Sequence, residues 1–180
     1  MKMPTLSSLL GLLAALSTTS LAEAPEGYRT VLITSSVDTK FVIVAKERVA
    51  GSTTIVKTRN DSATAEQSWY LKDGETKIQL AGTTLCMDGG PQANWRDMGA
   101  IYLQECDDDA VSQKWFVMDD GRIALEASQR KQCVDLVFMR AVENNDVGLF
   151  SCAGLGNIGA ADKGINWPLV DVEVDEEEEP

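Results

Sequence analysis

Apolar and polar residues alternate over short runs along most of this chain, and turn-forming residues separate the runs. The alternation is clear at residues 78–80, 101–103 and 123–125, while residues 28–33, 40–44 and 53–57 are rich in β-branched and aromatic side chains. Such runs are typical of half-buried β-strands. No segment has a sustained helical period, so the pattern predicts an all-β barrel or sandwich. Its expected core includes Ile78, Leu80, Ile101, Leu103, Trp115, Ile123, Leu125 and Leu149.

A tryptophan motif recurs at a long and nearly regular interval. Gln67-Ser68-Trp69 and Gln113-Lys114-Trp115 are 46 residues apart, and Trp167 follows 52 residues after Trp115. Asp-Gly turns come after the first two copies, at Asp73-Gly74 and Asp120-Gly121. Repetition at this interval indicates three structural units of about 45–50 residues each. We place the units at residues 27–71, 72–117 and 118–170 and expect their tryptophans to fill the core of a pseudo-threefold barrel.

The two ends of the chain differ in composition from the repeats. Residues 1–22 combine Lys2, an apolar run and the small-residue cleavage site Ser20-Leu21-Ala22, a pattern that predicts a secretory signal peptide. The apolar run is shorter than the roughly 20 residues that a membrane span needs, and we expect no span elsewhere. Residues 171–180 hold seven acidic residues, which predicts a disordered tail. The folded domain is therefore expected at residues 25–170.

Charge and residue types narrow the possible functions. The formal net charge is −12, so no basic surface for nucleic acid is expected. The chain has no histidine and no Gly-x-Ser-x-Gly motif, so nucleophilic catalysis lacks visible machinery, and we predict neither enzyme activity nor a cofactor. The run Asp107-Asp108-Asp109 could supply carboxylates for glycoside hydrolysis or for calcium. It lacks the pattern of a dedicated calcium loop, and a solvated turn is the simpler interpretation.

Four cysteines fit an oxidising, extracellular environment, and they allow three pairings. Cys86 and Cys106 lie in the second unit, and Cys133 and Cys152 occupy the matching places in the third. Pairing within each unit predicts the disulfides Cys86–Cys106 and Cys133–Cys152, each worth about 3 kcal/mol for a loop of this length. A zinc site is disfavoured because the chain has no Cys-x-x-Cys spacing and no histidine. Asn60 begins a glycosylation sequon in a polar loop.

The order of these motifs is similar to a known lectin repeat. An Asp-Gly turn, Cys-x-Asp, an alternating strand, a second cysteine and Gln-x-Trp follow one another in the second unit and partly in the third. This order resembles the repeat of the ricin B-chain-type lectin domain. The resemblance covers about residues 27–170, although unit one matches poorly. It implies a β-trefoil fold and a secreted, non-catalytic domain that binds carbohydrate, with galactose-type sugars as the first expectation.

The same resemblance implies which residues contact a sugar. The aspartate of Cys-x-Asp, here Asp88 and Asp135, would accept hydrogen bonds from two sugar hydroxyls at once. An aromatic residue two positions before the second cysteine would face the sugar ring. That residue is Phe150 in unit three, whereas Gln104 occupies the position in unit two. The possible substitutes in unit two are Tyr102 and Trp95.

Several positions depart from the family pattern. Unit one has Phe41-Val42-Ile43 where Cys-x-Asp belongs, so we interpret this unit as structural. Ser112 and Gly164 replace the asparagine that often precedes Gln-x-Trp, and Ile165 replaces the glutamine of unit three. Two functions therefore stay open. The domain binds carbohydrate, or its sugar sites have decayed and it binds a protein, with protease inhibition as one form because trefoil families include inhibitors.

Overall fold

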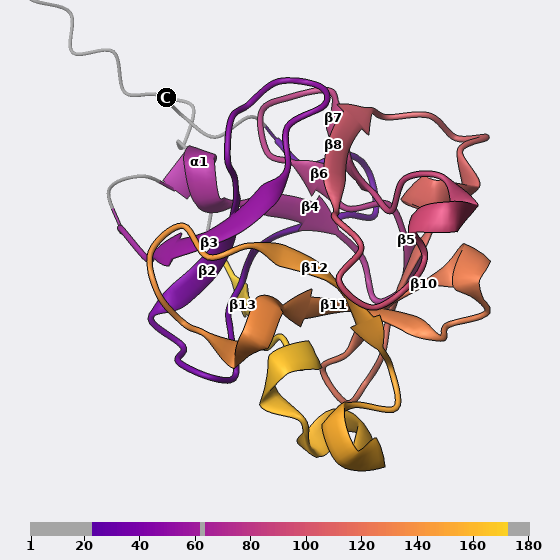
Figure 1. The fold of residues 1–180 in the computed structure, drawn as a ribbon. Coiled ribbons are helices and arrows are strands. Elements are labelled where there is room, and N and C mark those ends of the chain that lie inside the picture. The colour runs from indigo at the N-terminus through magenta and orange to yellow at the C-terminus, as the bar shows by residue number, and fades with distance from the viewer. Residues whose placement is uncertain (1–22, 62–63, 173–180) are drawn as a thin grey trace, which may run out of the picture.

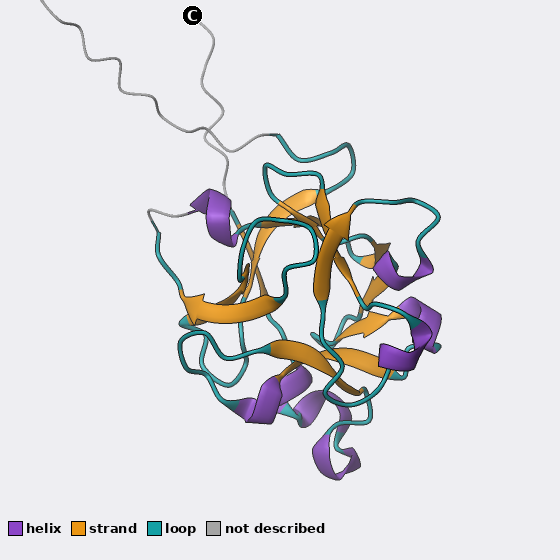
Figure 2. Cartoon of the chain, turned by 45° about the horizontal axis from the view of Figure 1, so that its top comes forward, coloured by secondary structure: helices purple, strands orange, loops and turns teal. Residues whose placement is uncertain are grey.

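Short β-strands make up most of the described chain, which is residues 23–61 and 64–172 of a computed structural model. The predicted signal peptide, residues 1–22, and residues 173–180 of the predicted tail lie outside the described residues. Figure 2 shows the strands at the centre and short helical turns around them. The strands are β1 (Arg29–Ile33), β2 (Phe41–Ala45), β3 (Thr54–Thr58), β4 (Trp69–Leu71), β5 (Gly74–Thr76), β6 (Gln79–Leu80), β7 (Leu85–Asp88), β8 (Tyr102–Glu105), β9 (Trp115–Val117), β10 (Ile123–Leu125), β11 (Gln132–Leu136), β12 (Val147–Ser151) and β13 (Leu169–Asp171).

The helical segments are short and belong to the connections between strands. They comprise α1 (Thr64–Gln67) and the 3-10 turns η1 (Gln92–Asn94), η2 (Val111–Gln113), η3 (Glu126–Ser128), η4 (Val137–Met139), η5 (Leu155–Asn157), η6 (Gly159–Ala161) and η7 (Lys163–Ile165). Within the described ranges, no helix has the length and apolar character that crossing a membrane requires.

Three antiparallel hairpins, β2–β3, β7–β8 and β11–β12, are arranged around a common centre (Figure 1). Each hairpin contacts the next through an isolated bridge, and the bridges close a cycle: Thr53 with Tyr102, Ala100 with Gly148, and Asp146 with Ile55. The other strands run in the order β13-β1-β4-β6 in one sheet and β10-β9-β5 in the second. The architecture is a β-trefoil, as the three repeats predicted.

The three repeated tryptophans occupy equivalent places in the core. Trp69, Trp115 and Trp167 are fully buried. Each indole N–H donates to a strand carbonyl, at 2.9 Å to Ile43, 3.0 Å to Met87 and 2.9 Å to Val134. A buried indole N–H needs such a partner, so these bonds fix the register of the repeats. The prediction that the tryptophans fill the core is confirmed. The other predicted core residues are also buried: Ile78, Leu80, Ile101, Leu103, Ile123, Leu125 and Leu149.

The tryptophan bonds correct the alignment of unit one by one residue. Ile43 accepts the bond that Met87 accepts in unit two, so Val42-Ile43-Val44 is the counterpart of Cys-x-Asp, and our alignment to Phe41-Val42-Ile43 was wrong. The expected loss of the carboxylate holds, because Val44 stands in the aspartate position. Val44 packs with Val42, Leu32 and Ile55 in a small apolar cluster, so this unit offers hydrophobic contacts in place of a polar site.

Both predicted disulfides are present. Cys86 is bonded to Cys106, and Cys133 to Cys152, with Cα–Cα separations of 5.0 Å in each pair. Each bridge ties the first strand of a hairpin, β7 or β11, to the residue that follows the second strand. No cysteine of the chain is left free.

The folded domain extends two residues further than the composition predicted. Asp171 belongs to β13 and pairs with Val31 of β1. The backbone N–H of Val172 donates to the carbonyl of Thr30 at 2.9 Å. Asp171 also forms an ion pair with Arg29. Our placement of the tail boundary at residue 171 was therefore too early, because strand pairing compensates for the acidic composition there.

Candidate functional site

Asp135 and Phe150, the predicted sugar contacts of unit three, line one pocket on hairpin β11–β12. The pocket has a volume of about 310 Å³, near the lower end of the range that is usual for small-molecule sites. The alternation of a strand explains the position of Asp135. Val134 and Leu136 belong to the main core cluster, so Asp135 points to the opposite face. The complete lining is Met98, Asp135, Phe138, Met139, Phe150, Leu155 and Asp162.

A glycine opposite Asp135 leaves the carboxylate uncovered. In the antiparallel pairing of β11 with β12, Asp135 faces Gly148. A Cβ atom at this glycine would lie 2.7 Å from the backbone oxygen of Gly99, so the close approach of two hairpins requires a residue without a side chain. In unit two the residue opposite Asp88 is Tyr102, whose ring adds bulk beside the carboxylate. The residue paired with the aspartate therefore differs between the two sites: it is a glycine in unit three and a tyrosine in unit two.

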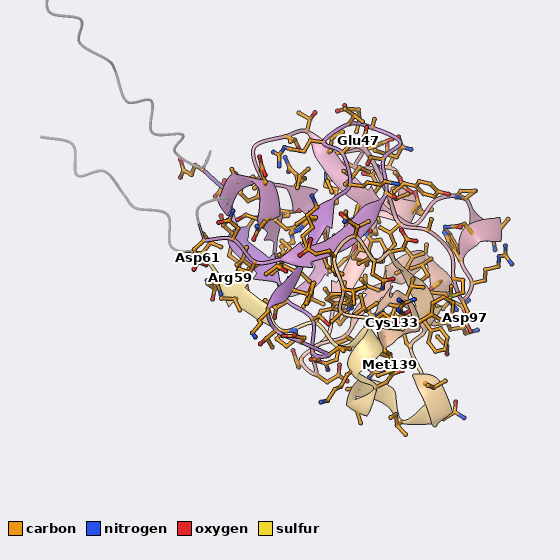
Figure 3. The ribbon with its side chains drawn as sticks, turned by 60° about the vertical axis from the view of Figure 1, so that its left-hand side comes forward. Glu47, Arg59, Asp61, Asp97, Cys133 and Met139 are labelled. Carbon is orange, nitrogen blue, oxygen red and sulfur yellow. A yellow bond between two sulfur atoms is a disulfide. The ribbon has the colours of Figure 1, made fainter. Side chains whose placement is uncertain are left out.

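The rim of the pocket is apolar and unusually exposed. Phe138 is 72% exposed, Leu155 63% and Met98 51%. Phe138 and Met139 both have left-handed backbone conformations, with φ of 58° and 53°. Consecutive non-glycine residues in this region are uncommon, and a second pair, Gln129 and Arg130, lies outside the pocket. Figure 3 shows the labelled Met139 and Asp97 in the same part of the molecule as Cys133 of β11, away from Arg59 and Asp61.

Two carboxylates lie at the base of the pocket. Asp162 accepts backbone hydrogen bonds from Gly164, at 2.9 Å, and from Leu155, at 2.6 Å, so it fixes the loop that contains η5 to η7. Asp135 is only 6% exposed, yet no described residue donates a hydrogen bond to its carboxylate. A buried polar group without a partner is costly, and this one faces the pocket. The acceptor positions of the Asp135 carboxylate are therefore open toward the pocket.

Asp135 lacks both of the donors that the equivalent Asp88 has: Ile165 stands in place of the glutamine, and the backbone N–H of Val137, two residues after Asp135, donates to the Asp146 carbonyl instead. In unit two, Gln113 donates from Nε2 to Asp88 at 3.1 Å. Ile165 has no donor, and it packs instead in a small apolar cluster with the Cys133–Cys152 disulfide. Burial, followed by the negative charges of Asp162 and Asp97, raises the pKa of Asp135 from the ordinary 3.8 to about 7. Carboxylates whose pKa is raised in this way occur frequently at functional sites.

Gly164, which replaces the amide-bearing residue of the family pattern, lets the chain pass close to Asp135. A Cβ atom there would lie 3.0 Å from Asp135 Oδ1, 3.0 Å from Met139 Cγ and 3.2 Å from Asp162 Oδ1. A side chain would have to displace these groups. The predicted absence of an amide in unit three thus has a steric cause, and the carboxylates of Asp135 and Asp162 are the polar groups nearest to the Gly164 Cβ position.

The predicted site of unit two is satisfied internally. Asp88 accepts from the backbone N–H of Gly90 at 2.7 Å and from Gln113 at 3.1 Å, so both of its oxygens have protein partners. Trp95 donates from Nε1 to the Gly90 carbonyl at 3.0 Å and packs against the main core. Tyr102 lies opposite Asp88 in the strand pair. These predicted contact residues are close together, and Asp88 has fewer free acceptor positions for a sugar than Asp135, because each of its oxygens already accepts one bond.

Five pocket residues were missed by the sequence analysis. They come from three segments that fold against hairpin β11–β12, namely the loop after η1, the turn η4 and the insertion that contains η5 to η7. The insertion carries a single acidic residue, and that was the one available signal. The missed residues are Met98, Phe138, Met139, Leu155 and Asp162.

Two other predicted features lie away from this pocket. Asn60 is exposed, and its glycosylation stays a prediction. The run at residues 107–109 forms a turn, since Asp107 accepts from the backbone N–H of Asp109 at 2.9 Å and Asp108 forms an ion pair with Lys77. Within the described part of the chain, no cluster of three or more His, Cys, Asp or Glu side chains could hold a metal ion.

The fold and the sequence together define the class of protein. The sequence profile of the ricin-type beta-trefoil lectin domain matches residues 29–137, so the chain belongs to this family. Domains of the family bind carbohydrate and are generally non-catalytic. The matched region includes Asp88 and Asp135 and ends before Phe150 and Asp162.

Solved structures share the fold at low sequence identity. The designed threefold-symmetric protein ThreeFoil is 17% identical, with a TM-score of 0.65, and the match covers 79% of this chain and 99% of that one. The C-half of an earthworm R-type lectin, in complex with GalNAc, is 17% identical with a TM-score of 0.60, covering 80% and 99%. A non-toxic type II RIP homologue from bitter gourd, in complex with α-methyl-D-galactoside, is 15% identical with a TM-score of 0.60, covering 79% and 48%. A search of curated proteins gives no match.

Proposed function

We propose that this protein is a secreted, non-catalytic lectin domain that binds a galactose-type sugar in the pocket of unit three. The observation that carries the proposal is Asp135, a buried carboxylate without a hydrogen-bond donor among the described residues, which faces a pocket also lined by Phe150. The galactose-type ligands held by the earthworm lectin and the bitter gourd protein support the choice of sugar. The predicted signal peptide at residues 1–22 and the two disulfides support secretion.

The chemistry of a pyranose matches the two kinds of group in the pocket. Hydroxyls on the edge of the ring would donate to Asp135, and C–H groups on one face would pack against Phe150. Exposed Phe138 would cover a second side of the ligand. The pocket is small and open at its rim, so few groups are ordered by binding. We expect a dissociation constant of about 1 mM, equivalent to about −4 kcal/mol.

A glycan array with the mature protein tests the proposal. We expect binding to terminal galactose-type glycans, and we expect Asp135→Ala to lose it because the acceptor is removed. Asp88→Ala is the matched control, since it deletes the equivalent carboxylate of unit two. Retention of binding by Asp135→Ala, or equal losses in both variants, would show that unit three is not the principal site.

A second candidate function is protein binding by a trefoil whose sugar sites have decayed. The exposed apolar side chains Phe138, Leu155 and Met98 favour it, since clusters of this kind often mark interaction surfaces. The closed site of unit two and the missing carboxylate of unit one also fit this alternative. An array without signal at high protein concentration would favour protein binding over the proposed lectin function.

A further inference from the structure

We infer that the pocket of unit three selects an amino sugar with a free, protonated amine over the neutral or N-acetylated sugar of the same configuration. The inference rests on the proposed function for the binding of a sugar ring in this pocket, and it adds the charge of the ligand. It follows from three features that have separate causes: the excess of negative charge, the missing donor to Asp135, and the apolar walls.

Negative charge surrounds the base of the pocket without a compensating cation. Asp135 and Asp162 are both buried lining residues, and the charge of Asp97 also acts on Asp135. No described Lys or Arg lines the pocket, and none forms an ion pair with these three carboxylates. The basic residues nearest in sequence to Asp97, Asp135 and Asp162 are Arg96, Lys131 and Lys163, and all three are exposed. A neutral ligand would leave this repulsion in place, whereas a cation would relieve it.

The unpartnered carboxylate of Asp135 shows where the ammonium group would bind. In unit two the amide Nε2 of Gln113 supplies an N–H donor to Asp88 at 3.1 Å, and Ile165 removes that donor in unit three. A ligand ammonium carries three N–H donors and a positive charge, and charge-assisted hydrogen bonds are the stronger kind. An ammonium group of the ligand would therefore donate to Asp135 in place of the missing glutamine amide.

Both carboxylates are directed to one small region. Asp135 Oδ1 and Asp162 Oδ1 lie 3.0 and 3.2 Å from the point that a Cβ atom of Gly164 would occupy. Asp162 cannot turn away, because two backbone N–H groups hold its oxygens. One cation beside Gly164 would thus lie within reach of both negative groups.

The walls increase the effect of charge. Phe150 and Phe138 line the pocket with aromatic rings, and Met98, Met139 and Leu155 complete an apolar lining. A cation over an aromatic face is attracted by the ring quadrupole. Asp135 and Asp162 are themselves buried, so water screens their attraction for an ammonium less than at an exposed site. Burial and the charges of Asp162 and Asp97 raise the pKa of Asp135 to about 7, so a bound cation should also displace a proton near neutral pH.

Calorimetric titration at pH 7 and low salt, with four ligands, tests the inference. The ligands are galactosamine, galactose, N-acetylgalactosamine and cyclohexylamine. We expect galactosamine to bind at least tenfold more tightly than either neutral sugar, and more tightly than cyclohexylamine, which has the amine without the hydroxyls. Asp162→Asn should reduce the ratio of galactosamine to galactose affinity. Asp108→Asn is the matched control, because it removes the same charge from an exposed turn outside the pocket and should leave the ratio unchanged.

The outcomes separate this inference from the proposed function. Equal affinities for galactosamine and galactose would overturn the inference and leave the lectin proposal standing. Cyclohexylamine binding as tightly as galactosamine would overturn it too, since the pocket would then recognise charge alone. No binding of any ligand would overturn both. If Asp162→Asn does not fold, 0.5 M NaCl in place of the substitution should lower the affinity ratio, because salt screens charge but affects neutral sugars little.

Discussion

Replacing Asp135 with asparagine should stabilise the free protein at alkaline pH. Burial raises the pKa of Asp135 in the folded protein from 3.8 to about 7. The unfolded chain releases this proton near pH 4, whereas the folded protein retains it until about pH 7. Between these values the folded state binds more protons, so stability falls as pH rises. Asparagine does not ionise, so the variant does not lose this stability as the pH rises.

The magnitude follows from the difference between the two pKa values. At about 1.4 kcal/mol for each pKa unit, a rise from 3.8 to about 7 corresponds to a loss of about 4 kcal/mol above pH 7, and to almost none at pH 4. We therefore expect Asp135→Asn to be more stable than the wild type by about 2–4 kcal/mol at pH 8. The same variant should lose sugar binding, so stability and function change in opposite directions, as expected of a strained binding site.

Urea unfolding with the disulfides intact, followed by tryptophan fluorescence at pH 4, 6 and 8, measures this effect. The control is Asp88→Asn, in which an amide replaces a carboxylate that already has two donors. We expect that variant to lose about 1 kcal/mol at pH 8, since it weakens satisfied hydrogen bonds. An Asp135→Asn protein that is less stable than the wild type at pH 8, or a stability difference that does not change with pH, would refute the reasoning.

Three further predictions concern the core, the site and the C-terminus. Trp115→Ala should cost about 3–5 kcal/mol, because it deletes a buried indole and its bond to Met87; an unchanged melting temperature would contradict this. Ile165→Gln should restore a donor to Asp135. The decline of stability between pH 4 and pH 8 should then become smaller, and an unaltered decline would contradict the explanation that Asp135 lacks this donor. Deletion of residues 173–180 should leave the melting temperature unchanged. Deletion of residues 171–180 should cost about 1–2 kcal/mol, because it removes strand and ion-pair contacts. Equal effects of the two deletions would contradict the domain boundary at residue 172.

The sequence predicted those parts of the fold that repeat. The tryptophans and cysteines recur at matching positions, so their burial and pairing followed from the interval alone. Asp135 and Phe150 were predicted together because both positions are defined relative to cysteines of the same unit. Unit one has no cysteine, so nothing fixed its register, and our alignment was displaced by one residue. Composition also misplaced the tail boundary, because it does not reveal that Asp171 pairs with β1.

The remainder of the site depends on contacts between distant segments. Asp162 and Leu155 reach the pocket because the insertion folds back on β11, and Met98 comes from another unit. No local sequence pattern predicts that these distant segments meet at one pocket. The difference between the two aspartate sites also arises from pairing, since Tyr102 lies opposite Asp88 and Gly148 opposite Asp135. Both residues were visible in the sequence, but their effect required the register of the hairpins.

An NMR titration of the mature protein with methyl galactosides tests the central claim most directly, because it locates the ligand on the chain. The account predicts saturable shifts, with a dissociation constant of about 1 mM, for resonances of Asp135, Phe150 and Gly164. Asp135→Asn should abolish these shifts while the rest of the spectrum is retained. Shifts confined to residues near Asp88 and Tyr102, with none near Asp135 and Phe150, would contradict the account.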